Sequence, residues 1–169
     1  WRAVGPGGSV EIAEAPQQDC DFAEIRRLAG LDALQALYAR AGLRFSVIDL
    51  RREWVRTRDG IIVERHPLPG DPRGYRAVDL GERSFFTGSG LEPRRFRGAD
   101  YDPGPTSAEH EGGHNRYLLS ETVLSADLVV NLPKLKTHKK TGVTLAFKNL
   151  VGINGDKNWL PHHSLGSPS

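Results

Sequence analysis

A continuous apolar run, Leu-Val-Val at residues 128–130, limits the folds open to this chain. A short run of this kind is typical of a strand buried on both faces, as in a parallel sheet covered by helices. Residues 141–153 follow with helical spacing of apolar side chains, and Thr141 suits the cap of that helix. We therefore predict an α/β fold with a mainly parallel or mixed sheet, flanking helices and long irregular connections in the middle.

Shorter patterns predict the other elements. Apolar residues recur at helical spacing in residues 31–41, and Gly42 is a suitable stop. Asp59-Gly60 separates two strand-like segments and suits a type I′ turn, which predicts a hairpin. We predict helices at 21–28, 31–41 and 120–126, and strands at 9–13, 45–50, 54–58, 61–65, 75–80 and 84–87.

The length of 169 residues fits a single α/β domain over residues 1–169. Residues 66–116 are rich in Pro, Gly, Asp and Arg and are predicted to be irregular, whereas residues 127–153 form a basic strand-loop-helix motif. The chain contains no methionine, so we expect that residue 1 is not the native start and that the domain is incomplete.

The composition excludes several classes of protein. The single cysteine, Cys20, rules out an intrachain disulfide, and this chain alone is expected to bind no iron–sulfur cluster. No apolar run approaches the roughly 18–20 residues of a membrane span, so we expect no membrane partner. A formal charge of +2 is too small to indicate a nucleic-acid binder. We predict a cytoplasmic protein.

The clearest functional signal is a cluster of basic residues. No Asp or Glu occurs between Asp127 and Asp156, although five lysines and one histidine do. If residues 133–138 are extended, the side chains of Lys134, Lys136 and His138 point to one side. On the predicted helix, one face packs and the opposite face meets these cations; the packed face carries Val143, Ala146, Phe147 and Leu150, and the opposite face Thr141, Thr144 and Lys148.

A strand end followed by a helix N-terminus is a common place for an anion. We therefore predict a phosphate- or carboxylate-binding pocket within residues 131–149, whose ligand set is Lys134, Lys136, His138, Thr144, Lys148 and Asn149. If the site is catalytic, His138 is the candidate acid or base, and Lys136 or Lys148 stabilises charge. The competing interpretation is a solvated basic face, because most runs of charged residues form solvent-exposed surface.

A second motif, His110-Glu111-Gly112-Gly113-His114, has the H-E-x-x-H spacing of zinc hydrolases. That interpretation needs a helix, with His110 and His114 as metal ligands and Glu111 as the base. The two glycines disfavour a helix by about 2 kcal/mol relative to alanine. A turn is therefore the favoured interpretation, and the metal-dependent hydrolase is kept as an alternative.

The segments 127–155 and 110–119 resemble the domain of unknown function 362 family. The resemblance implies that Lys134, Lys136, His138, Thr144, Lys148, Asn149 and Gly152 occupy the characteristic motif positions of that family. It implies no reaction, so enzyme or non-enzyme stays open, and so do the cofactor and the oligomeric state. Family members are generally longer and some carry ferredoxin-type iron–sulfur modules, which suggests that this chain is truncated at both ends. A further alternative is thus a module whose lysines dock an acidic iron–sulfur protein such as a ferredoxin.

Overall fold

A computed structural model describes residues 4–100, 102–138 and 142–164 of the chain. These residues divide into two compact units, one ending at Pro72 and the other beginning at Arg73. The sequence-based expectation of one domain stays a prediction.

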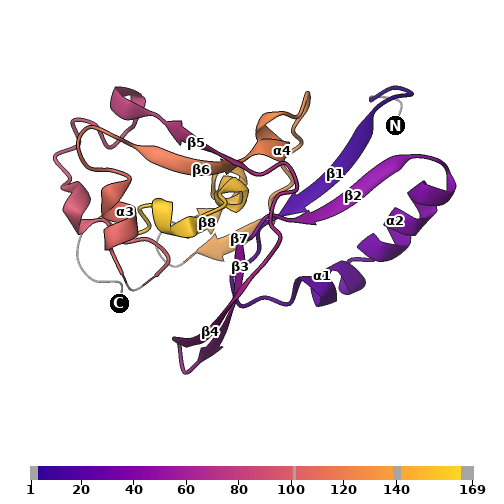
Figure 1. Cartoon of the computed structure of the whole chain (residues 1–169), viewed down its shortest axis with the longest axis horizontal. Coiled ribbons are helices and arrows are strands. Elements are labelled where there is room, and N and C mark those ends of the chain that lie inside the picture. Colours follow the sequence, from indigo (N-terminus) through magenta and orange to yellow (C-terminus); the bar gives the residue numbers. More distant parts are fainter. Residues whose placement is uncertain (1–3, 101, 139–141, 165–169) are drawn as a thin grey trace. The chain divides into compact units, whose positions relative to one another are not determined.

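The first unit is built on a parallel pair of strands that two helices connect. Its elements, in chain order, are β1 (Ser9–Glu14), α1 (Phe22–Leu28), α2 (Leu31–Arg40), β2 (Arg44–Asp49), β3 (Glu53–Arg58) and β4 (Ile61–Pro67). β1 and β2 pair in parallel, and a parallel pair needs a long crossover, which α1 and α2 supply. Figure 1 shows both helices along one side of the β1–β2 pair. The Tyr38 ring of α2 contacts the Phe45 ring of β2, with ring centroids 5.2 Å apart.

Local sequence signals set the boundaries in this unit. The Asp21 carboxylate accepts a hydrogen bond from the backbone N–H of Glu24 at 3.1 Å and so caps α1. Asp59 and Gly60 have φ angles of 51° and 77°, as a type I′ turn requires, and they join β3 to β4. The predicted helices at 21–28 and 31–41 and the predicted hairpin are confirmed, with boundaries shifted by one or two residues.

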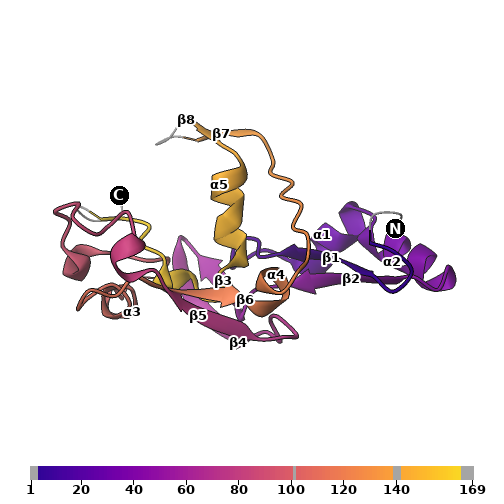
Figure 2. The ribbon, with the colours of Figure 1, turned by 90° about the horizontal axis from the view of Figure 1, so that it is seen from above.

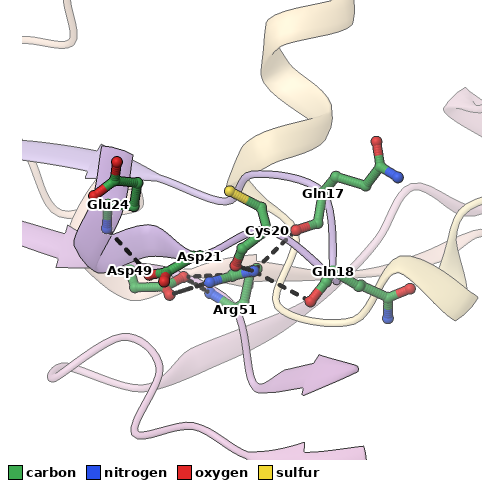
Figure 3. A network of polar contacts seen from close by, with 7 residues as sticks. All are labelled: Gln17, Gln18, Cys20, Asp21, Glu24, Asp49 and Arg51. Carbon is green, nitrogen blue, oxygen red and sulfur yellow. Dashed lines mark hydrogen bonds and ion pairs between the residues drawn. The ribbon is translucent and has the colours of Figure 1, made fainter. Parts of the chain in front are cut away.

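A buried arginine holds the connection that leaves β1 (Figure 3). Arg51 is 4% exposed, and its guanidinium forms an ion pair with Asp49 at 2.7 Å. Its Nη1 atom donates to the backbone carbonyls of Gln17, Gln18 and Cys20 at 2.9, 3.2 and 2.9 Å. The guanidinium presents five fixed donors, so one side chain can bond several carbonyls of an irregular connection at once.

The second unit contains a longer antiparallel pair and a small hairpin. Its elements are β5 (Tyr75–Asp79), η1 (Gly81–Arg83), η2 (Pro93–Arg95), α3 (Gly104–Ala108), β6 (Arg116–Ser120), α4 (Glu121–Leu124), β7 (Lys136–His138), β8 (Gly142–Thr144), α5 (Ala146–Asn149), η3 (Leu150–Ile153) and η4 (Lys157–Trp159). β5 pairs with β6 and β7 with β8, both antiparallel. The backbone after η3 runs beside β6, where the Gly155 N–H donates to the Leu118 carbonyl at 2.7 Å. A Cβ atom at Gly155 would overlap the Tyr75 ring, so only glycine fits there.

The core of the second unit forms around an imidazole. His110 is 2% exposed and makes edge contacts with the rings of Phe86, Phe96 and Tyr117, with centroids 6.0, 5.6 and 5.4 Å away. Its Nε2 atom lies 2.9 Å from the Trp159 carbonyl oxygen, and its Nδ1 atom lies 3.2 Å from the Asn115 side-chain oxygen. His110 therefore joins η4 to the chain before β6 and also fills apolar space.

The α/β class is confirmed, with one parallel and three antiparallel pairs among the described strands. The predicted strand at 128–130 is wrong. Leu128, Val129 and Val130 are 70%, 52% and 67% exposed, and no strand pairs with them in the described part of the chain. An apolar run becomes a buried strand only where a neighbouring strand and a covering layer exist.

Two other predictions also need correction. Residues 84–87 form successive turns, in which the Thr87 N–H donates to the Ser84 carbonyl at 3.0 Å, and not a strand. The helix predicted over 141–153 is a strand, four helical residues and a 3-10 turn. Gly142 has a φ of 75° and is followed by β-branched Val143 and Thr144, which favour an extended chain. The proposed cap, Thr141, lies outside the described residues.

Replacing Arg51 by methionine should lower the free energy of unfolding by about 3 kcal/mol, because Asp49 and three carbonyls lose their buried partner. Urea unfolding followed by circular dichroism measures the change. The matched control is Arg58→Met, which removes an exposed arginine at the end of β3. Equal unfolding midpoints for the two variants would contradict this role.

Replacing His110 by alanine should cost about 3 kcal/mol of stability, since it opens a cavity among three aromatic rings and leaves the Trp159 carbonyl unpaired. Glu111→Ala removes the neighbouring exposed side chain and should change stability by less than about 0.5 kcal/mol. The same urea titration compares the two variants. A stable His110→Ala protein would show that this imidazole is not a core residue.

Candidate functional site

The basic arm, defined here as residues 131–149, carries the whole predicted ligand set. β7 and β8 pair in a register that puts Lys136 opposite Thr144 and His138 opposite Gly142. Side chains alternate along a strand and face their cross-strand partners, so Lys136, His138 and Thr144 share one face of the hairpin. Figure 2 shows this hairpin at the end of α5 that lies away from β6.

Thr144 has a polar atom that its surroundings do not satisfy. The residue is 5% exposed, and its Oγ1 atom has no hydrogen-bond partner among the described residues. Leaving a buried hydroxyl unpaired costs about 1–3 kcal/mol. The Thr144 hydroxyl therefore lies on the face of Lys136 without a described hydrogen-bond partner.

Asn149 has a positioning contact within the arm. Its side-chain Nδ2 atom donates to the Asn131 side-chain oxygen at 2.7 Å, and the Asn131 amide donates to the Ala146 carbonyl at 3.0 Å. These two bonds connect the segment before β7 to α5. The Asn131–Asn149 pair could not be derived from the sequence, because an Asn-to-Asn contact across 18 positions leaves no periodic signal.

The described lysines of the arm are exposed. Lys134, Lys136 and Lys148 form no ion pair with any described residue, and Lys139 and Lys140 lie outside the described part. The structure groups Lys136, His138 and Thr144 on the hairpin, places Lys134 in the preceding segment and Lys148 on α5, and ties Asn149 to Asn131. The expected contribution of a long helix N-terminus is wrong, because α5 has four residues and begins at Ala146.

The H-E-x-x-H segment is a turn, as the favoured interpretation predicted. Gly112 and Gly113 have φ angles of 65° and 84°, which a helix does not contain. The two imidazoles have different partners: His110 lies in the aromatic core, and the His114 Nδ1 atom lies 2.6 Å from an Asp79 carboxylate oxygen. The helical zinc arrangement of His110, Glu111 and His114 is therefore wrong for this chain. No group of three or more His, Cys, Asp or Glu side chains that could hold a metal occurs among the described residues.

Asp79 organises the turn that follows β5. Its carboxylate accepts hydrogen bonds from the backbone N–H groups of Asn115 and Gly81, both at 2.8 Å, and contacts His114. The pKa of Asp79 is lowered from 3.8 to about 2. The largest cause is the hydrogen bond from the Asn115 N–H, followed by those from His114 and from the Gly81 N–H, because all three favour the charged carboxylate.

Two further observations limit the chemistry of the chain. Burial raises the pKa of the Cys20 thiol, despite the opposing charge of Arg51, so this cysteine lacks the thiolate character of an activated nucleophile. In the described part of the chain, no helix has the length and apolar character needed to cross a bilayer.

Asp79→Asn should reduce the pH dependence of stability in acid. A carboxyl whose pKa is lower in the folded state stabilises the fold above its unfolded pKa of about 4, and this contribution disappears as the pH falls through about 2. The variant should therefore unfold more easily at pH 6 and lose less stability than the parent between pH 4 and pH 2. Urea midpoints measured across this range test the prediction. Asp127→Asn, which removes an exposed carboxylate, should keep the parental profile.

The chain is similar to a known protein family and to a longer relative. A family model described as a domain of unknown function, DUF362, matches residues 40–167. A thylakoid-associated protein of Synechocystis is 40% identical over 86 residues, which is 51% of this chain and 25% of that relative. The chain thus spans about a quarter of the length of that relative. No solved structure matches the chain. Because the family model covers well over half of the residues, this chain belongs to the DUF362 family.

Proposed function

We propose that the basic arm binds a small anion that carries phosphate or carboxylate groups. The observation that carries the proposal is the shared face of Lys136, His138 and Thr144, on which a buried hydroxyl without a partner lies across the strand pair from an exposed ammonium. A hydroxyl and a cation together can satisfy both the hydrogen bonding and the charge of an oxyanion.

The surrounding charge supports this proposal. The arm contains no acidic residue, and its described lysines have no ion-pair partner, so no described internal carboxylate competes with a bound anion. Lys134 and Lys148 contribute long-range attraction, which weakens as salt increases. Asn149 acts through Asn131 by holding α5 to the segment before β7.

Binding is the function that the geometry supports best. The roles of His138 as acid or base and of Lys136 as charge stabiliser stay predictions, as does docking to an iron–sulfur protein. The Synechocystis relative is named as thylakoid-associated, and thylakoids are membranes. An anionic lipid headgroup is therefore one source of the anion that we propose for this chain.

Titration with inorganic phosphate, followed by the backbone amide signals of β7 and β8 in NMR spectra, should give saturable shifts at Lys136–His138 and Gly142–Thr144. Thr144→Val should weaken this binding by about fivefold to tenfold, because one hydrogen bond to the anion is lost. The same variant should keep or gain stability, since it removes an unpaired buried hydroxyl.

Charge variants complete the test. Lys136→Gln should weaken phosphate binding by about tenfold, whereas Arg58→Gln removes an equal charge from the exposed end of β3 and should leave it unchanged. Shifts that do not saturate, or equal affinities for the parent, Thr144→Val and Lys136→Gln, would refute the proposed site.

A further inference from the structure

The basic arm exposes more apolar surface than a solvated charge run needs. Five large apolar side chains within its described residues are exposed: Leu132 (81%), Leu135 (72%), Val143 (46%), Leu145 (48%) and Phe147 (91%). Single exposed apolar residues are ordinary on protein surfaces, but a continuous group of them marks a surface that another phase or molecule covers.

The hairpin and its flanks arrange three of these residues on one face. Thr137 lies opposite Val143, on the face that does not carry Lys136 and Thr144. Leu135 and Leu145 directly flank these two strands, and strand alternation assigns them to the face of Val143. The hairpin is therefore amphipathic, with Leu135, Val143 and Leu145 on one face and Lys136 and His138 on the other.

Both faces of the hairpin reach the surface. Lys136 is exposed on the polar face, although Thr144 beside it is 5% exposed, and Val143 and Leu145 are 46% and 48% exposed on the apolar face. A hairpin in water normally turns its apolar face toward the core and its polar face outward. The outward apolar face indicates a partner that is itself apolar, and the neighbouring lysines indicate that this partner is also anionic.

A bilayer surface with anionic headgroups meets both conditions. Apolar side chains enter the boundary between headgroups and acyl chains, while the long lysine side chains reach the phosphates. Each lysine near such a surface gains attraction to it, and the arm has no acidic residue that would be repelled. Figure 2 shows the arm extending away from the β5–β6 pair of the same unit, so that pair does not keep the hairpin from entering a bilayer surface.

We propose that the amphipathic β7–β8 hairpin docks the protein peripherally on anionic phospholipid bilayers. Leu135, Val143, Leu145 and Phe147 enter the interface, and Lys134, Lys136 and Lys148 contact the headgroups. The inference rests on the proposed function, because the headgroup phosphate takes the place of the free anion beside Lys136 and Thr144. It departs from the sequence-based expectation of no membrane partner, which rests on the lack of a spanning run; surface docking needs no such run.

Sedimentation with vesicles tests the proposal. The chain should sediment with vesicles of equimolar phosphatidylcholine and phosphatidylglycerol, remain in solution with pure phosphatidylcholine, and dissociate as salt is raised. Leu135→Ser and Phe147→Ser should each lower the vesicle partition coefficient by about tenfold, because each removes an inserted side chain. Both should leave the affinity for inorganic phosphate unchanged. The matched control is Leu37→Ser, which removes a leucine that is 59% exposed on α2, and it should partition as the parent does.

The possible outcomes separate this inference from the proposed function. Phosphate binding without vesicle binding would overturn the membrane inference alone, and loss of both would overturn both proposals. Equal partition of the Leu135→Ser and Leu37→Ser variants, or equal binding to neutral and anionic vesicles, would also overturn it. A dimer in gel filtration that Leu135→Ser dissociates would show that a second copy covers this face, and binding only to an acidic protein would assign the face to that partner.

Discussion

Two-stranded sheets leave many backbone N–H and C=O groups without a neighbouring strand. In this chain, buried polar side chains supply hydrogen-bond partners for some of these groups. Each described strand has a single partner strand, so one side of it must find other hydrogen-bond partners or face water. Arg51 donates hydrogen bonds to three carbonyls after β1, and the His110 imidazole contacts the Trp159 carbonyl oxygen through its Nε2 atom. Buried polar residues outnumber buried apolar ones among the described residues, ten against five, so polar networks decide much of the packing.

The same constraint explains why the basic arm projects. The segment before β7 has the apolar composition of a central strand but no described strand beside it. The bonds between Asn131, Ala146 and Asn149 hold it to α5, which belongs to the same arm. A segment held by side-chain amides and not by a sheet ladder keeps its apolar residues exposed. This exposure is what makes a surface function more consistent with the structure than a deep pocket.

Signals that act within a few residues could be predicted from the sequence. Asp21 caps α1 and Asp59-Gly60 turns the hairpin, since both effects depend only on backbone conformation and adjacent groups. The turn at Gly112-Gly113 was equally predictable, because two glycines disfavour a helix. The strand at 128–130 was not, because periodicity cannot show whether a partner strand exists. The ring contacts of His110 were also hidden, since Phe86 and Trp159 meet it only through the folded chain.

The secondary structure of residues 142–149 decides which chemistry the arm can perform. With a helix over these residues, Thr144 and Lys148 would share a face and Val143 would pack with Phe147. In the observed hairpin, Thr144 faces Lys136, and Val143 lies on the opposite side. The change pairs the Thr144 hydroxyl with Lys136 in place of Lys148, and it exposes the apolar residues that a packed helix would bury. One segment can therefore carry the proposed anion ligands on one face and an exposed apolar surface on the other.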